Sequence, residues 1–499
     1  MSRKIKATAL LLIGLMSFST LVGCSKDNTE QKAEDATTGQ QTTASQQEKP
    51  VQNPQKEEPV NLIWWTIGNE PKDYQIVSEA INEYTKEKLN VTVTLKYASW
   101  GDYGKKLSNI IQSGEPYDIA FGSGINGYGD LINKGYFADL TGYLNEVAPD
   151  LKSFIPEELW QGVTSNGEIF GVPAFKDSAQ AQYWVWDKEL VERLNIDISQ
   201  INTLQELEPA LKKIKEDDPT KYPLILTGNE GINGFMIAIN NFDGLATGVG
   251  VKYDDESAKV QILWEDPGVM ENLKIIHKWF NEGLINPDAA TLTEAPKYRP
   301  VYAAQGFPHA WENAIDYPRA DHHFFGPAYS TGTIQGSFLA ISEASKHIEE
   351  SLQLIELVNT DAYLRNLLAY GVEGTHYNKL TDNSIEKISD RYEAPAYTQG
   401  TFFNMYTVAP APETMWSDLK KQQESAFASP ALGFSLDRQP IQNQMAACTN
   451  IIDKYQPSLL TGAMNPEEMV PVMLEELEKA GIQDIVDEVQ KQLDAYLGK

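Results

Sequence analysis

The sequence predicts an α/β protein of two lobes with a helical C-terminal extension. Strand-like apolar runs alternate with helical patterns early in the chain, which is the order of a parallel sheet covered by helices. About 440 residues follow Pro59, more than one ordinary core accommodates, so two folded units are expected. Helical patterns with clear end signals then dominate the C-terminal part.

The chain begins with the pattern of an export signal. Three cations precede an apolar stretch at 7–22, which is shorter than a membrane span requires. The following "LVGC", ending at Cys24, resembles the lipobox of bacterial lipoproteins, in which the cysteine is acylated. An ordinary signal peptide with an incidental cysteine is the alternative. We predict a signal peptide at 1–23, a palmitate-type lipid anchor on Cys24 and a place on the extracellular face of the cell membrane.

A disordered tether is predicted at 24–58. Gln, Thr, Lys, Glu and Asp dominate it, and it has no aromatic residue with which to build a core. As a flexible coil of about 34 residues it would hold the body on the order of 30 Å from the membrane. The second cysteine, Cys448, has no other partner in the chain, so we expect a small buried apolar side chain.

The first elements are predicted from their spacing. Residues 60–65 form an apolar strand, and apolar residues across 74–84 at helical spacing predict the helix that follows. Valines and a leucine alternate with threonine across 91–95 as a second strand, and 118–121 predicts a third. This βαβαβ order predicts a parallel sheet.

Later elements have sharper ends. A capping box at 203–206 begins a helix, and 223–226 predicts a buried strand. A leucine-rich helix ends at Gly371, cap residues bracket a helix at 465–481, and an apolar stripe at 485–497 predicts the last helix. We expect the C-terminal part to be purely helical.

Composition and motifs exclude several classes of function. The formal charge of −29 makes nucleic acid an unsuitable partner, because its phosphates require clustered cations. The sequence has no P-loop, His-Glu-x-x-His, calcium loop or nucleophile elbow. His322 and His323 are adjacent, so on a strand they point to opposite faces and suit no shared metal. We expect no cofactor and no metal, although 70 acidic residues leave a chance catalytic carboxylate pair open.

Aromatic and polar residues are concentrated in loops. Three such loops, "IWWTIGNEP", "YASWGDY" and "FGSGINGYGD", directly follow the predicted strands. Ligands bind α/β sheets at the carboxyl ends of parallel strands. Aromatic rings suit the C–H faces of sugars, and Asp, Glu, Asn and Lys suit their hydroxyls. These loops therefore predict a carbohydrate site.

Longer stretches resemble a known family. "SWGDYGKKLSNIIQSGEPYDIAFGSG" and "NGEIFGVPAFKD" resemble family 1 extracellular solute-binding proteins, the receptor lipoproteins of bacterial carbohydrate ABC importers related to maltose-binding protein. "LVNTDAYLRNLLAYGVEGTHY" and "SPALGFSLDRQPIQNQMAACTNIIDKY" are similar to a Gram-positive subgroup with its own C-terminal domain of uncharacterised function.

The resemblance implies a two-lobed, type II periplasmic-binding-protein fold with a hinge. Lobe 1 would comprise 59–171 plus 326–380, and lobe 2 would comprise 172–325 plus 381–499 with the C-terminal helices. It also implies a monomeric, non-enzymatic receptor that closes on a carbohydrate, which we expect to be an oligosaccharide, and presents it to ABC permease subunits.

Candidate ligand contacts in the first lobe lie in the three loops. Each has an alternative role. Core packing is the alternative for Trp65 and Tyr128, and helix capping is the alternative for the loop around Glu70. A simple turn is the alternative for the glycine-rich loop of Ser123 and Asn126. The indole in the Ser-Trp-Gly loop is costly to bury, which favours the cleft. The candidates are Trp65, Glu70, Trp100, Ser123, Asn126 and Tyr128.

The remaining candidates follow the predicted crossing between lobes or lie in the second lobe. A surface ion pair is the alternative role for Lys176 and Asp177, and core packing is the alternative for Trp184. A structural role is the alternative for Glu373 and His376. The resemblance places a stacking tryptophan in "HAWEN". The candidates are Lys176, Asp177, Trp184, Trp311, Glu312, Glu373 and His376.

Two other functions share these features. A surface-anchored enzyme that degrades polysaccharides would have the same leader, tether and aromatic loops. A lipoprotein that binds peptides or acts as a sensor would also have them.

Overall fold

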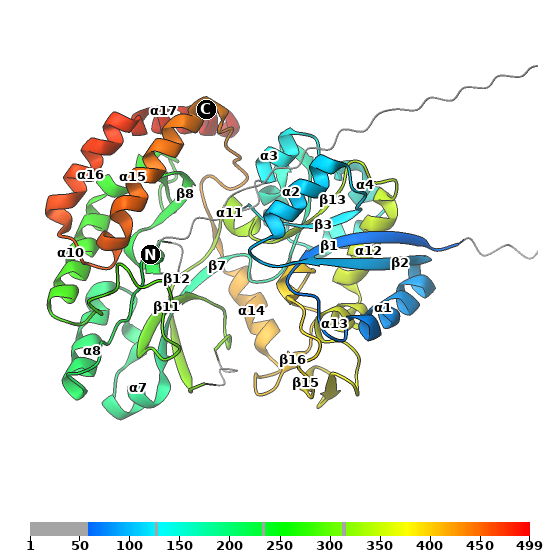
Figure 1. The fold of residues 1–499 in the computed structure, drawn as a ribbon, viewed down its shortest axis with the longest axis horizontal. Helices are drawn as coiled ribbons and strands as arrows, with labels where there is room; N and C mark the ends of the chain where they lie inside the picture. The colour runs from blue at the N-terminus through cyan, green and yellow to red at the C-terminus, as the bar shows by residue number, and fades with distance from the viewer. Residues whose placement is uncertain (1–57, 125–127, 232–234, 312–315) are drawn as a thin grey trace, which may run out of the picture. The chain divides into compact units, whose positions relative to one another are not determined.

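The structure is a computed structural model that describes residues 58–124, 128–231, 235–311 and 316–499. Two large hydrophobic cores organise these residues, each packed against its own sheet (Figure 1). Each core together with its sheet forms one lobe, and we number the two lobes in chain order as lobe 1 and lobe 2. The predicted signal peptide, Cys24 and the tether up to residue 57 lie outside the described residues.

Lobe 1 is built on a five-stranded sheet with the order β2-β1-β3-β13-β6. β1, β2 and β3 are parallel, with Trp64 opposite both Leu95 and Ile119, which confirms the predicted βαβαβ arrangement. β13 returns from much later in the chain and runs antiparallel to β3. The strands are β1 (Val60–Ile67), β2 (Val91–Ala98), β3 (Ile119–Gly122), β6 (Val172–Pro173) and β13 (Phe338–Ile341).

Amphipathic helices cover this sheet. α1 buries Val77, Ile81 and Thr85 at a spacing of four, which places them on one face. Asp361 separates two later helices, and its carboxylate accepts a hydrogen bond from Leu364 N at 2.8 Å. The elements are α1 (Tyr74–Leu89), α2 (Tyr103–Ser113), α3 (Tyr128–Asn133), α4 (Thr141–Glu146), α5 (Pro149–Phe154), α6 (Glu157–Gly162), β4 (Thr164–Ser165), β5 (Glu168–Ile169), α11 (Thr331–Ile334), α12 (Ile348–Thr360) and α13 (Ala362–Tyr370).

Lobe 2 contains a second sheet with the order β11-β7-β12-β17 and a small one with the order β10-β9-β8. α8 begins with the predicted capping box, in which Thr203 accepts from Glu206 N at 3.3 Å. The predicted strand at 223–226 is reduced to isolated bridges at Leu224. The elements are β7 (Gln180–Asp187), α7 (Lys188–Leu194), α8 (Leu204–Asp217), α9 (Phe235–Ile239), β8 (Phe242–Ala246), β9 (Val249–Lys252), β10 (Gln261–Ile262), α10 (Pro267–Asn281), β11 (Val301–Gln305), β12 (Arg319–Tyr329) and β17 (Phe427–Ala428).

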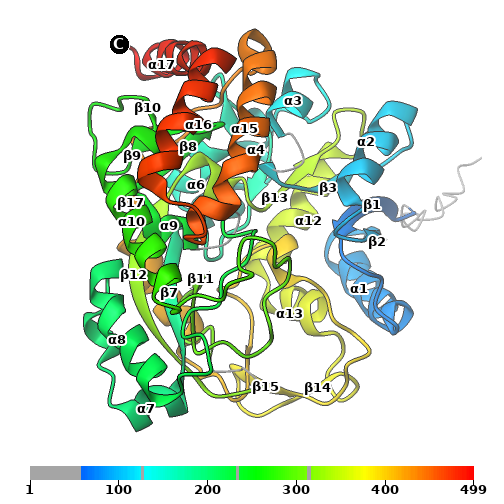
Figure 2. The ribbon, with the colours of Figure 1, turned by 60° about the vertical axis from the view of Figure 1, so that its left-hand side comes forward.

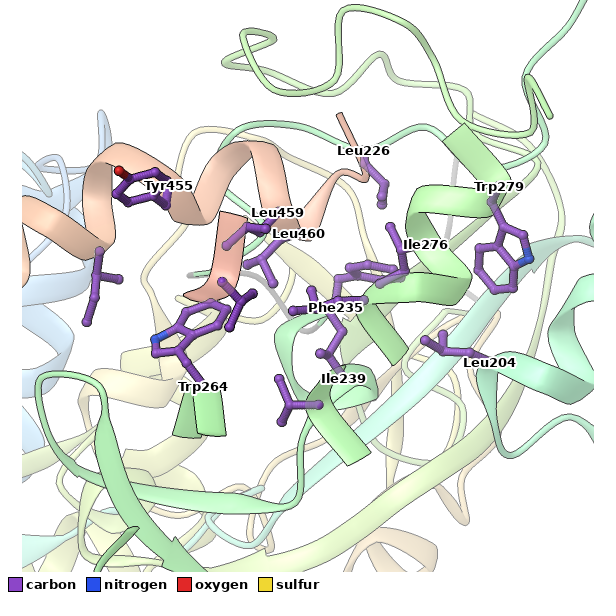
Figure 3. Close-up of a cluster of buried hydrophobic side chains, with 14 of the residues drawn as sticks. Leu204, Leu226, Phe235, Ile239, Trp264, Ile276, Trp279, Tyr455, Leu459 and Leu460 are labelled. Atoms are coloured by element: carbon purple, nitrogen blue, oxygen red, sulfur yellow. The ribbon is translucent and has the colours of Figure 1, made fainter. Parts of the chain in front are cut away.

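The last three helices, α15 (Gln442–Leu460), α16 (Pro466–Ala480) and α17 (Ile482–Leu497), belong to the core of lobe 2. Figures 1 and 2 show α16 beside α10 and α15. Side chains of α15, such as Leu459, point into the same cluster as Trp264 and Ile276 (Figure 3). Asn465 and Gly481 cap α16 as predicted. Cys448 is buried in this core, as expected of a small apolar side chain.

The first passage between the lobes lies later than the predicted boundary at 171/172. β6 pairs with β13, so 172–173 belong to the sheet of lobe 1. Phe175 and Ala179 pack in the core of lobe 1, whereas Trp184 packs in the core of lobe 2. The chain therefore crosses at about 176–180.

The predicted end of lobe 1 at 380/381 also differs from the boundary that the structure shows. Arg365 of α13 is fully buried, and its guanidinium donates to Thr401 O at 2.6 Å and to Ala396 O at 2.7 Å. This ties 396–401 to lobe 1. Burial lowers the pKa of Arg365 to about 10. Between α13 and α15 the chain also forms β14 (Tyr377–Lys379), β15 (Ser384–Lys387), β16 (Thr407–Val408) and α14 (Met415–Glu424), so the C-terminal part is not purely helical.

Two further passages join the lobes. β12 carries the second: Phe324 packs against the core of lobe 2 and Tyr329 against that of lobe 1, so the chain returns to lobe 1 between these two residues. The third lies between Ala426, which packs against lobe 1, and Phe434, which lies in the core of lobe 2; between them, Ala431 packs into the core of lobe 2 and Leu432 into that of lobe 1. Three passages at one place form the hinge region.

Candidate functional site

The carboxyl ends of β1, β2 and β3 lie at one edge of the lobe 1 sheet, because these strands are parallel. β6 is antiparallel to β13 and so ends at the same edge, where it leads the chain towards lobe 2. The loops that follow these strands therefore lie beside the first passage, as ligand sites of α/β sheets do.

Trp100, directly after β2, is the most exposed aromatic side chain at this edge, with 61% of its surface accessible. Its ring stacks on Tyr397, with centroids 5.7 Å apart and planes at 20°. Tyr397 comes from the segment that Arg365 ties to lobe 1, so the indole rests on a fixed partner. Trp100 thus presents an open aromatic face.

The other loop candidates at this edge differ in exposure. Glu70 is exposed after β1, whereas Ser123 after β3 is 8% exposed. The neighbouring Gly124 N donates to Gln335 O at 2.8 Å, which fixes the start of the glycine-rich loop. Asn126, in the same loop, lies outside the described residues.

Two candidates of lobe 1 lie in cores instead. Trp65 is 6% exposed, packs among Tyr103, Leu107 and Phe121, and has Lys106 Nζ 5.0 Å from its ring centroid. Tyr128 is 3% exposed and donates to Val163 O at 2.9 Å. Both faces of this sheet are covered, so the strand end offers no open face to Trp65. These placements correct the expectation that both rings face a ligand.

Lys176 and Asp177 form an ion pair of 2.7 Å within the first passage. Both side chains are largely buried, at 12% and 17% exposure. Gln305 Nε2 lies 3.5 Å from the Asp177 carboxylate, which brings the end of β11 beside the pair. The two charges compensate each other, so this part of the site is close to neutral.

Trp184 is fully buried and stacks on Phe324 in the core of lobe 2, which corrects its assignment as a ligand contact. Alternation along β7 points it into that core. Trp311 is half-buried and meets Tyr302 edge to face, with centroids 6.0 Å apart. Its Nε1 is buried and has no hydrogen-bond partner among the described residues. Glu312 lies outside the described residues.

Glu373 and His376 organise the loop after α13 rather than the edge with Trp100. His376 is 1% exposed, and its Nδ1 accepts from Val372 N at 2.9 Å. Its Nε2 lies 3.5 Å from the Asp73 carboxylate, whose pKa the guanidinium of Arg391 lowers. Glu373 is exposed and pairs with Lys379 at 3.8 Å. This corrects the assignment of His376 as a ligand contact, since its ring is closed off within the loop.

Lobe 2 also contains a cavity of about 790 Å³ at the edge formed by β7 and β11, which was not predicted from the sequence. We call it the β7–β11 cavity. Its polar wall includes Gln180, Gln182, Thr227, Glu230, Arg299 and Gln305. The guanidinium carbon of Arg299 lies 3.7 Å from the Tyr302 ring centroid. The alternating glutamines of "SAQAQYW" were the available signal.

The third passage is held at both ends. Ser429 Oγ donates to the Asp243 carboxylate of β8 at 2.5 Å, and burial raises the pKa of Asp243 to about 6. Tyr496 of α17 donates to Leu432 O at 2.8 Å. Gly433 adopts φ 86°, and a Cβ there would lie 2.2 Å from the Tyr496 hydroxyl. The last helix is thus attached to the hinge region.

No cluster of three metal-ligating side chains occurs among the described residues. In the same part of the chain, every helix is too short or too polar to cross a membrane.

Two family models match the chain. Residues 68–364 match the model described as Bacterial extracellular solute-binding protein, and residues 430–498 match the one described as Domain of unknown function (DUF3502). A carbohydrate ABC transporter substrate-binding protein of Streptococcus pneumoniae serotype 4 is 29% identical over 452 residues, which cover 87% of this chain and 90% of that protein.

The N-glycan transport solute binding protein (NgtS) from Streptococcus pneumoniae is similar in structure. Its crystal structure matches with a TM-score of 0.82 and 27% identity, covering 88% of this chain and 99% of that one. Its complex with Man5GlcNAc matches with a TM-score of 0.68 at the same identity and coverage.

Proposed function

The chain belongs to the bacterial extracellular solute-binding protein family, and we propose that it is a membrane-anchored receptor that binds an oligosaccharide between its lobes and delivers it to an ABC permease. Its homologues are substrate-binding proteins of ABC transporters, not enzymes. This agrees with the family resemblance found in the sequence.

One geometric observation carries the proposal. The exposed ring of Trp100 stands at the carboxyl edge of the lobe 1 sheet, and the polar β7–β11 cavity of lobe 2 begins at Gln180, where the chain emerges from the first passage. Stacking surface and hydrogen-bonding groups thus come from different lobes that meet at one hinge. A sugar ring needs both kinds of contact.

Closure about the hinge region is part of the proposal. Three passages connect the two cores, so the lobes share no continuous core that would prevent rotation. The crystal structure of NgtS and its complex with Man5GlcNAc match this chain to different extents. Such a difference supports a fold in which lobes move about a hinge.

The carbohydrate ligand is proposed from chemistry and from relatives. Aromatic and amide side chains dominate the candidate contacts, and the two similar pneumococcal proteins are named for carbohydrate or N-glycan transport. We take N-glycan oligosaccharides as the first compounds to test. The protein would act as a monomer, because a single chain supplies both lobes.

Anchoring through Cys24 is proposed from the "LVGC" stretch alone. A lipid anchor would keep the receptor beside its permease and raise its effective concentration there. Mass spectrometry of the protein purified from membranes tests this, since an acylated N-terminal cysteine is expected and an unmodified Cys24 would contradict it.

Calorimetric titration of the full-length protein in detergent tests the function. The panel should contain Man5GlcNAc, other oligosaccharides of plants and hosts, and short peptides. We expect saturable binding of an oligosaccharide and recovery of that sugar intact. Cleaved sugar would favour the degrading enzyme, and binding of peptides alone would favour the peptide receptor. Uptake of the bound sugar by cells, lost when the permease genes are deleted, tests delivery.

A further inference from the structure

Gln182 of β7 is fully buried, yet neither its Nε2 nor its Oε1 has a hydrogen-bond partner among the described residues. Buried amides in native proteins are almost always paired, because leaving them unpaired costs free energy. Gln423 shows the usual arrangement: it is 4% exposed, and its amide bonds Ala179 N at 2.7 Å and Ala179 O at 3.3 Å. The unpaired state of Gln182 therefore requires an explanation.

Gln182 belongs to a group of three glutamines on one face of the lobe 2 sheet. Gln305 of β11 lies directly opposite it in register, and Gln180 lies two residues earlier on the same face. All three line the β7–β11 cavity. Further along β7 this face becomes apolar at Trp184 and Trp186, which enter the core. The amides are thus confined to the end of the sheet beside the first passage.

The glutamine end of the cavity is neutral. Lys176 and Asp177 compensate each other there. The guanidinium of Arg299 lies on the ring of Tyr302, three residues before Gln305, which corresponds to roughly 10 Å along the strand. Each amide both donates and accepts hydrogen bonds, and so does each hydroxyl of a sugar. A charged ligand would meet amides and an already compensated ion pair at this end, whereas a hydroxyl finds both a donor and an acceptor there.

We propose that Gln182, supported by Gln180 and Gln305, is a specificity-determining ligand contact whose amide hydrogen-bonds the hydroxyls of a neutral sugar residue. This rests on the proposed function. Without ligand the amide remains unpaired and destabilises the protein, and the sugar supplies the missing partners. The same amide would discriminate against apolar and charged ligands, because neither satisfies both of its atoms.

The proposal predicts opposite effects of one substitution on stability and affinity. Gln182→Met keeps the volume and removes the unpaired amide, so the thermal midpoint without ligand should rise by roughly 2 °C. The same change should weaken binding of the tightest oligosaccharide of the panel, with Man5GlcNAc as the first probe, by about 10- to 100-fold. Gln423→Met is the matched control, since losing paired hydrogen bonds should lower the thermal midpoint.

Scanning calorimetry and isothermal titration on the full-length protein give both readouts. A raised midpoint with unchanged sugar affinity would overturn the inference, because the unpaired amide would then make no contact with the sugar. A lowered midpoint would also overturn it, by showing a structural role. If the unaltered protein bound no sugar at all, the proposed function and this inference would both be wrong. If the unaltered protein and Gln182→Met bound sugar equally well, only this inference would be wrong.

Discussion

Replacing Trp100 with alanine should weaken sugar binding while leaving the fold almost unchanged. An indole side chain offers about 150–250 Å², so its 61% exposed part leaves about 90–150 Å² for a ligand. A sugar ring covering one face would bury about half of that, worth about 1–2 kcal/mol. The affinity should therefore fall about 6- to 25-fold. Only the stack on Tyr397 is lost from the free protein, about 0.5–1.5 kcal/mol.

Tyr363→Ala is the matched control for Trp100→Ala. Tyr363 is 54% exposed and packs on the ring of Tyr84 at 4.7 Å, so it is similar in exposure and in aromatic contact. It lies on α13, outside the loops that follow β1, β2 and β3. Both variants should be titrated with the tightest oligosaccharide and unfolded in urea. Equal affinities of Trp100→Ala and the unaltered protein would refute the stacking role, as would an equal loss in both variants.

The remaining predictions concern the hinge, a buried cation and the anchor. The raised pKa of Asp243, about 6 against 3.8, means that its protonated form stabilises the fold at low pH and that this stabilisation is lost as the pH rises through 6. Unfolding in urea should show about 1–2 kcal/mol of pH-dependent loss between pH 5 and 7.5 that Asp243→Asn lacks; identical profiles would contradict this. Arg365→Met should cost about 2–4 kcal/mol in the same assay by stranding the carbonyls of Ala396 and Thr401, and a cost near zero would disprove the network. Cys24→Ala should keep sugar affinity and reduce cellular uptake, so undiminished uptake would count against the anchor.

Elements with strong local signals were predictable from the sequence. The caps Asn465 and Gly481 and the capping box at 203–206 act within one helical turn, so no distant contact can override them easily. The predicted strand at 223–226 shows the limit. An apolar run indicates burial, but whether it pairs along its length depends on a neighbour, and Leu224 meets its partners Ile285 and Val301 only in isolated bridges.

The tryptophans show why site residues were harder to predict than elements. Alternation places Trp64 and Trp65 on opposite faces of β1, but it does not reveal that both faces are covered. Their exposures are 1% and 6%. Alternation was equally insufficient to predict the burial of Trp184 on β7. The exposure of Trp100 was predictable for a different reason: it stands in a loop, where no sheet neighbour competes for its ring.

The lobe boundaries depended on contacts that no local pattern contains. β6 is only two residues long, and its place in lobe 1 comes from pairing with β13, more than a hundred residues away. From the sequence, Arg365 could be recognised only as part of a helix. Its hydrogen bonds to distant carbonyl groups reveal that the segment after α13 stays with lobe 1.

The glutamines of β7 were present in the sequence but looked like part of a core strand. Their neighbours Tyr183, Trp184, Val185 and Trp186 are all buried, so the run as a whole indicates a strand with no open face. An amide in such a run finds its hydrogen-bond partners either within the protein or in a ligand, and Gln182 has no partner among the residues that the structure describes. Lobe 1 supplies the exposed ring of Trp100, and lobe 2 supplies amides whose neighbours Trp184 and Trp186 are buried. Neither lobe alone can satisfy a sugar, which has apolar faces and a polar rim. Under the proposed function, tight binding would require both lobes at once, and that requirement would couple occupancy of the site to closure of the hinge.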